Sequence, residues 1–145
     1  CAYEAKKRAG VTGKVIGLGS GNASCARMRE LGHVDEIIQV DATNALAVYN
    51  AIMEKTNGKL CDVVINCVNI PGTELASIMA CKDEGLVYFF SMATSFTAAA
   101  LGAEGIGKDV TMIVGNGYTK DHAVISLELM RESKELRDMF NKLWV

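Results

Sequence analysis

The sequence lacks the features that mark several large classes of protein. It has a single proline, Pro71, and aromatic residues make up only 6% of its 145 residues. No apolar run approaches the ~20 residues that a membrane span requires, and no signal peptide is visible. The formal net charge is −2, which gives no electrostatic reason to expect nucleic acid or an anionic membrane as a partner. We therefore expect a cytoplasmic protein that binds neither.

Zinc sites and disulfides are not indicated either. The cysteines are odd in number and never form a C-x-x-C pair, and the two histidines, His33 and His122, lie far apart in the sequence. Structural zinc needs closer, paired ligands, and disulfide frameworks need paired cysteines. We therefore expect no metal and no catalytic residue in this chain, both histidines at the surface or in loops, and buried, reduced thiols at these positions: Cys1, Cys25, Cys61, Cys67 and Cys81.

What the chain does have is apolar residues, at 50%, in alternating strand and helix patterns. This content suffices for one core, so we expect one domain. Apolar strand patterns fall at residues 14–18, 36–40, 61–68, 86–90 and 110–114, with helical patterns between them. Residues 61–68 read as a strand covered on both faces, and the last helical patterns place Val124, Leu127 and Leu129 inward. The alternation predicts an α/β fold with a Rossmann-like, doubly wound parallel sheet.

The first ten residues read as the end of an amphipathic helix that closes at Gly10. In a doubly wound sheet the phosphate-binding turn lies between the first strand and the first helix. We therefore expect the first strand and its glycine-rich turn to lie upstream, so that 1–145 forms a partial dinucleotide-binding domain. Two inner strands would then each have a bare edge. The missing ladder bonds, at about 1 kcal/mol each, would leave the chain alone marginally stable.

A second alignment to the fold stays open. Gly19-Ser-Gly21-Asn-Ala-Ser24 approximates the G-x-G-x-x-G turn with serine in the third place, and Asp41 follows Gly21 by 20 residues, near the spacing of the ribose-binding acid. In this reading residues 14–18 form the first strand and nothing is missing. The sequence Asn22 to Leu31 would then be the first helix, capped by Asn22.

Several segments together resemble the nucleotide-binding domain of medium-chain dehydrogenases. The stretch "YEAKKRAG…GKVIGL" is similar to the end of their first helix and their second strand. "RELGHVDEIIQVDATN" resembles the turn into their third strand, and "CDVVINCVN" their fourth. The segment "VYFFSMATSFTAAALGAEGIGKDVTMIVGNGY" is similar to an amino-acid dehydrogenase of lysine fermentation within that superfamily. The resemblance covers Cys1 to about Tyr118 and implies that the opening strand lies outside this chain.

The resemblance implies NAD as cofactor, bound beyond the carboxyl ends of the strands. It places Gly19 and Ser20 near the adenosine ribose, where relatives that select NAD usually have an acid, so NADP stays open. By the strand-end rule we expect contacts with adenine at Asp41 and Ala42, and contacts with nicotinamide at Cys67, Val68, Asn69, Ser91 and Met92.

The implied function is that of the NAD(P)-binding portion of an oxidoreductase that oxidatively deaminates a small amino acid. The substrate-binding domain would be absent from this chain, and the portion alone would be inactive. The last strand would lie at the sheet edge, where this superfamily pairs subunits, which predicts a homodimer. The alternative is a stand-alone nucleotide-sensing Rossmann module that regulates a partner protein, which would need its own intact glycine turn.

Overall fold

A computed structural model describes residues 1–115 and 119–144. Within them, parallel strands alternate with helices, as the sequence predicts. The strands are β1 (Ile16–Gly19), β2 (Glu36–Gln39), β3 (Cys61–Asn66), β4 (Cys81–Phe89) and β5 (Val110–Val114). The helices are α1 (Ala2–Ala9), α2 (Asn22–Leu31), α3 (Ala45–Lys55), α4 (Glu74–Ala80), α5 (Phe96–Gly105), α6 (His122–Glu132) and α7 (Lys134–Trp144). None of the described helices is long and apolar enough to cross a membrane.

The strands form two separate sheets rather than one. β1 pairs with β2, and β4 lies between β3 and β5. Among the described residues no strand pairing joins β1 to β3, so each has one neighbouring strand only. The alternative alignment requires an unbroken five-stranded sheet, and the residues that the structure describes do not form one. β5 is an edge strand, as predicted, while the pairing of subunits through it stays a prediction.

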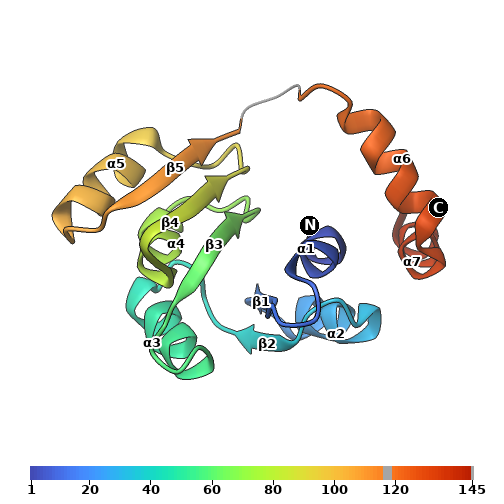
Figure 1. Ribbon diagram of the computed structural model, residues 1–145, viewed down its shortest axis with the longest axis horizontal. Helices are drawn as coiled ribbons and strands as arrows, with labels where there is room; N and C mark the ends of the chain where they lie inside the picture. The colour runs from blue at the N-terminus through green and yellow to red at the C-terminus, as the bar shows by residue number, and fades with distance from the viewer. Residues whose placement is uncertain (116–118, 145) are drawn as a thin grey trace.

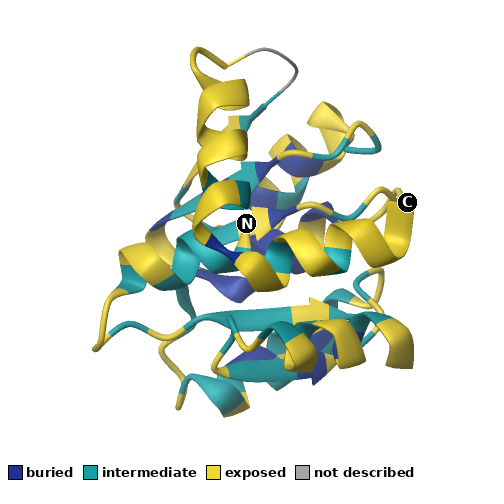
Figure 2. Ribbon diagram, turned by 90° about the vertical axis from the view of Figure 1, so that its right-hand side faces the viewer, coloured by how far each residue is buried: buried dark blue, intermediate teal, exposed yellow. Residues whose placement is uncertain are grey.

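Helices lie on both sides of the strands. Figure 1 shows α3, α4 and α5 on one side, and α1, α2, α6 and α7 on the other. Two apolar cores lie between the strands and the helices α3, α4 and α5. One joins α4 and α5 to β4 through Ile78, Val87 and Phe89, each 0% exposed. Figure 2 shows how the buried residues gather in the interior, while the outer turns of the helices are exposed.

The second core connects the two sheets. Val48 and Ile52 of α3, both 2% exposed, pack with Ile38 of β2 and with small residues of α4. Ile16 of β1 and Val64 of β3 pack against the same cluster. α3 therefore packs against strands of both sheets, because Val48 and Ile52, four positions apart, lie on one face of the helix.

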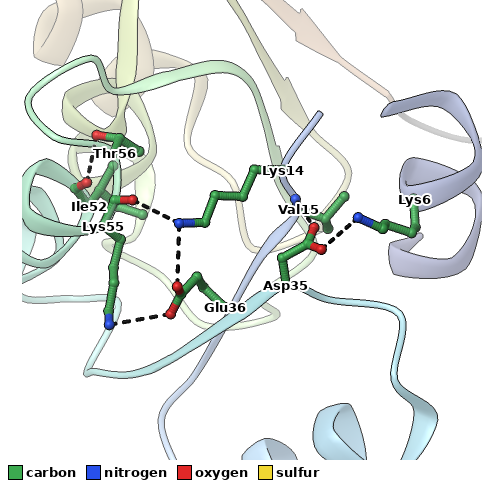
Figure 3. Close-up of polar contacts among 8 residues, drawn as sticks. All are labelled: Lys6, Lys14, Val15, Asp35, Glu36, Ile52, Lys55 and Thr56. Carbon is green, nitrogen blue, oxygen red and sulfur yellow. Dashed lines mark hydrogen bonds and ion pairs between the residues drawn. The ribbon is translucent and has the colours of Figure 1, made fainter. Parts of the chain in front are cut away.

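A polar network holds the amino ends of β1 and β2 (Figure 3). The carboxylate of Glu36, at the start of β2, forms ion pairs with Lys14 Nζ at 3.4 Å and with Lys55 Nζ at 3.3 Å. Asp35 Oδ1 accepts a hydrogen bond from Lys6 Nζ at 2.6 Å. Because Lys55 ends α3, this network also ties the end of that helix to the amino ends of β1 and β2. The candidate residues follow the carboxyl ends of the strands.

Several details differ from the expectations. The predicted strand 61–68 is covered on one face only, because Val63 and Ile65 are 53% and 46% exposed. The predicted inward positions of α6 are also wrong, since Val124 and Leu127 are 53% and 57% exposed. Leu129 is half-buried.

The expected cap of one helix was off by one residue, and both histidines lie where the sequence suggested. Gly21, rather than Asn22, caps α2. Pro71 lies in the turn before α4. His33 lies in the loop between α2 and β2, as expected, and is half-buried. Its ring packs edge-on against that of Tyr3, with 4.8 Å between the ring centroids, and its enclosed Nε2 has no hydrogen-bond partner among residues 1–115 and 119–144. His122 is exposed, as expected.

Candidate functional site

The first group of candidate residues follows β1 and β2. Val40 N donates to Gly19 O at 3.0 Å, which extends the ladder to the strand ends and holds Gly19 and Ser20 beside Asp41 and Ala42. Ser20 and Asp41 are exposed, and Gly19 and Ala42 are half-buried. These four residues thus form one continuous patch at the carboxyl edge of the two-stranded sheet.

The carboxylate of Asp41 organises its own turn rather than capping α3. Oδ1 accepts hydrogen bonds from Thr43 N at 2.9 Å and from Thr43 Oγ1 at 2.8 Å. These bonds hold the pKa of Asp41 below its usual value, so the group is a carboxylate at neutral pH. The cap of α3 is Asn44, whose side chain accepts from Ala47 N.

Gly19 lets α2 lie close to β1. A Cβ at this position would lie 2.6 Å from Ser24 Oγ and 3.2 Å from Cys25 Sγ. Ser24 Oγ in turn donates to Gly21 O at 2.8 Å, across the first turn of α2. The absence of a side chain at Gly19 therefore leaves room for the start of the helix beside the strand end.

The second group follows β3 and β4. Ser91 Oγ donates to Asn69 Oδ1 at 3.4 Å and accepts from Ala93 N at 3.1 Å. Cys67, Asn69 and Met92 are exposed, with Met92 at 88%. The hydrogen bond between Ser91 and Asn69 joins the two strand-end loops into one patch at the edge of the three-stranded sheet.

A buried polar cluster underlies this second patch. Asn66, the last residue of β3, is 5% exposed. Its Nδ2 donates to Thr73 Oγ1 and to Ser77 Oγ, both at 2.9 Å, and its Oδ1 accepts from Val68 N at 2.9 Å. The side chain thus links the strand end to α4 and orients the loop that carries Cys67 and Val68.

Glu74 holds the loop after β4 in place through a hydrogen bond. This residue begins α4 and is 3% exposed, and its Oε1 accepts from Ser95 N at 2.7 Å. Ser95 caps α5 by accepting from Ala98 N. The buried carboxylate therefore ties the end of the loop after β4 to the start of α4.

Cys67 contacts a residue that is distant in sequence. Its Sγ lies 3.6 Å from Sγ of Cys1, at the start of α1. Both cysteines are exposed, so the expectation of buried thiols is wrong for these two. It holds for Cys25 and Cys81, which are 0% exposed, while Cys61 is partly exposed and burial raises its pKa to about 11.

The structure therefore gathers the candidates into two patches, one on each sheet, and does not test their roles. Sequence reasoning missed the residues beneath the second patch: Asn66, Thr73, Glu74 and Ser77. An asparagine inside the apolar run 61–68 was the available signal for Asn66. Within the described ranges, no group of three or more His, Cys, Asp or Glu residues could hold a metal ion.

Comparison with solved structures identifies the class to which the fold corresponds. The structure of a 2R,3R-butanediol dehydrogenase from Bacillus subtilis is similar, with a TM-score of 0.61 and 24% sequence identity. The match covers 90% of this chain and 35% of the dehydrogenase chain. The mycobacterial protein Rv1454c, solved with NADPH, matches 91% of this chain and 40% of its own, with a TM-score of 0.55 and 18% identity. The predicted resemblance to medium-chain dehydrogenases is thus confirmed at the level of the fold.

Sequence comparison gives a more particular result, although no family model matches the chain. Two L-erythro-3,5-diaminohexanoate dehydrogenases, from Fusobacterium nucleatum and Acetoanaerobium sticklandii, are each 52% identical to it over all 145 residues. The chain is therefore homologous to these enzymes along its whole length. It spans 42% of the length of each relative.

Proposed function

We propose that this chain is the dinucleotide-binding portion of an L-erythro-3,5-diaminohexanoate dehydrogenase. The observation that carries the proposal is the 52% identity to two such enzymes over the entire chain. The shared fold with a butanediol dehydrogenase supports the oxidoreductase class. The substrate-binding domain would lie in the part of the relatives that this chain does not span.

The division of the sheet supports a dinucleotide fold whose first strand is supplied from upstream. In the strand order 3-2-1-4-5-6 the first strand lies between the second and the fourth. β1 and β3 would correspond to those two strands, and within the described part of the chain each has a neighbouring strand on one side only. An inserted strand would pair with both, and the turn after it would bind the diphosphate at the start of the helix that α1 completes.

The two patches would divide the cofactor between them. Gly19 and Ser20 would lie by the adenosine ribose, and Asp41 and Ala42 by adenine. The loops after β3 and β4, with Cys67 to Asn69 and Ser91 and Met92, would face nicotinamide. Asp41 Oδ1 is engaged with Thr43, and no carboxylate stands at positions 19 and 20 to repel a 2′-phosphate. We propose NAD as cofactor, with NADP compatible with the same residues.

The reaction would be an oxidative deamination. When bound, the nicotinamide would serve as the hydride acceptor for the carbon that bears the 3-amino group. The products would be 5-amino-3-oxohexanoate and ammonia. The task of this chain would be to bind and orient the dinucleotide. Asn66 and Glu74 hold the loops that would face the reacting ring, and the exposed Met92 would shield it from water.

The experiment begins with the source protein. Intact mass and N-terminal sequencing show whether the native chain is about twice this length or more, as the proposal expects. The purified protein is then incubated with L-erythro-3,5-diaminohexanoate and NAD⁺, and NADH and ammonia are measured together. Equal amounts of both support the proposal, and NADP⁺ in place of NAD⁺ decides the cofactor.

A long native chain that forms neither product from this substrate contradicts the proposed activity. A native chain that starts near Cys1 and binds NADH favours the nucleotide-sensing module instead. Binding is measured by the fluorescence of NADH. The close approach of α2 to Gly19 is the feature of the structure that suits this second candidate, because a phosphate-binding turn needs such a glycine.

A further inference from the structure

Cys1 and Cys67 bring two exposed thiols together from distant parts of the chain. Their Sγ atoms lie 3.6 Å apart although 66 positions separate them in the sequence. Cys1 precedes the first residue of α1, and Cys67 follows the last residue of β3. Both thiols are accessible to a small oxidant.

The other three cysteines differ from this pair in exposure. Cys25 and Cys81 are 0% exposed. Cys61 and Cys81 are Cα partners in the ladder between β3 and β4, but burial raises the pKa of both thiols, that of Cys61 to about 11. Because the thiolate is the reactive form, these buried thiols are protected against oxidation.

We propose that Cys1 and Cys67 form a reversible disulfide under peroxide, and that this bond tethers the start of α1 to the carboxyl end of β3. α1 belongs to the β1–β2 side of the molecule, since Lys6 binds Asp35 at the start of β2. The disulfide would therefore be a covalent link between parts of the molecule whose strands do not pair.

The chemistry requires one equivalent of peroxide. Burial raises the pKa of the Cys67 thiol, so we assign Cys1 as the attacking thiol and Cys67 as the resolving thiol. The Cys1 thiolate attacks the O–O bond of hydrogen peroxide, which gives a sulfenic acid and releases water after proton uptake. The Cys67 thiol then attacks the sulfenic sulfur, an S–S bond forms, and the sulfenic oxygen leaves as a second water. Two thiols lose two electrons and two protons, and the peroxide accepts both.

The bond has a consequence for the cofactor that depends on the proposed function. Cys67 belongs to the loop assigned to nicotinamide, and a bond to Cys1 would fix this loop against α1. A disulfide between them would hold both at bonding distance and obstruct the dinucleotide. We expect oxidised protein to bind NADH at least tenfold more weakly than reduced protein, and dithiothreitol to restore binding.

The test treats the reduced protein with hydrogen peroxide and maps non-reduced peptides by mass spectrometry. The expected product has lost two hydrogen atoms and contains one Cys1–Cys67 peptide. C1S and C67S should each abolish this peptide. The matched control C61A removes a third thiol and should leave the peptide unchanged, and circular dichroism verifies that each variant is folded.

Two results would overturn the proposal. One is a disulfide that joins Cys67 to a cysteine other than Cys1. The other is oxidation of Cys1 and Cys67 to sulfinic acids at the same rate in wild type, C1S and C67S, which would show that the thiols react independently. A mapped Cys1–Cys67 peptide without any NADH binding by reduced protein supports the disulfide and contradicts the proposed function instead.

Discussion

Replacing Asn66 with alanine should destabilise the fold because this side chain serves three partners at once. The substitution removes the hydrogen bonds to Thr73 Oγ1, Ser77 Oγ and Val68 N, each 2.9 Å long. At about 1 kcal/mol of net stabilisation for each bond, the upper bound is about 3 kcal/mol.

The two hydroxyls keep other partners in the variant. Ser77 Oγ still donates to Thr73 O at 2.9 Å, and Thr73 Oγ1 to Ile70 O at 3.5 Å. Only the amide of Val68 is left without its acceptor. We therefore expect N66A to lower the free energy of unfolding by about 2–3 kcal/mol, measured by urea denaturation followed by circular dichroism.

A double-mutant cycle with S77A tests the cause. S77A removes the bond from Asn66 and also the bond from Ser77 Oγ to Thr73 O, so it should cost about 1–2 kcal/mol. Because the bond between Asn66 and Ser77 is lost in both single variants, the double variant should cost less than their sum by about 1 kcal/mol. A loss below about 0.5 kcal/mol in N66A, or strictly additive effects in the cycle, would refute the view that this cluster holds the strand end.

Two further predictions concern the other sheet. G19A should lower the free energy of unfolding by about 1–3 kcal/mol, because the new Cβ would lie 2.6 Å from Ser24 Oγ. The control G105A should be neutral or stabilise by up to about 1 kcal/mol, since nothing lies within 4 Å of a Cβ there. Equal effects of the two variants in thermal unfolding would contradict this. Hydrogen bonds from Lys6 and from a backbone amide hold the pKa of Asp35 below its usual value, so its stabilisation is present above about pH 4 and is lost as the pH falls through the folded-state pKa. D35N should therefore lose less stability than wild type between about pH 4 and pH 2 in denaturant titrations at each pH; identical pH profiles would disprove the role of the carboxylate.

The order of the elements was predictable from the sequence because it rests on periodicity. The apolar stripe with Val48 and Ile52 predicted α3, and both residues are 2% exposed. The strands were found from short β-branched runs, and their parallel pairing follows from the helices between them. The break in the sheet was expected from the resemblance of the first residues to the end of a crossover helix, and β1 and β3 are indeed unpaired with each other within the described part of the chain.

What could not be predicted depends on contacts between distant residues. Periodicity gives the inward face of a helix, but not whether a neighbour covers it, and Leu127 of α6 is 57% exposed for that reason. The same holds for Val63 of β3, where an apolar run predicted cover on both faces. The proximity of Cys1 to Cys67 required the fold itself, since 66 positions separate them.

The two candidate patches differ in what holds them, and this difference bears on the proposed cofactor. The patch after β3 and β4 rests on buried hydrogen bonds within one sheet, at Asn66 and Glu74. The patch after β1 and β2 belongs to the other sheet, and α3 provides the apolar contact between them. A dinucleotide bound as proposed would span both patches, so its affinity would depend on their separation as well as on its contacts. A strand between β1 and β3 would fix that separation through hydrogen bonds on both of its edges, and ordering this strand would strengthen cofactor binding without touching the nicotinamide or adenine loops.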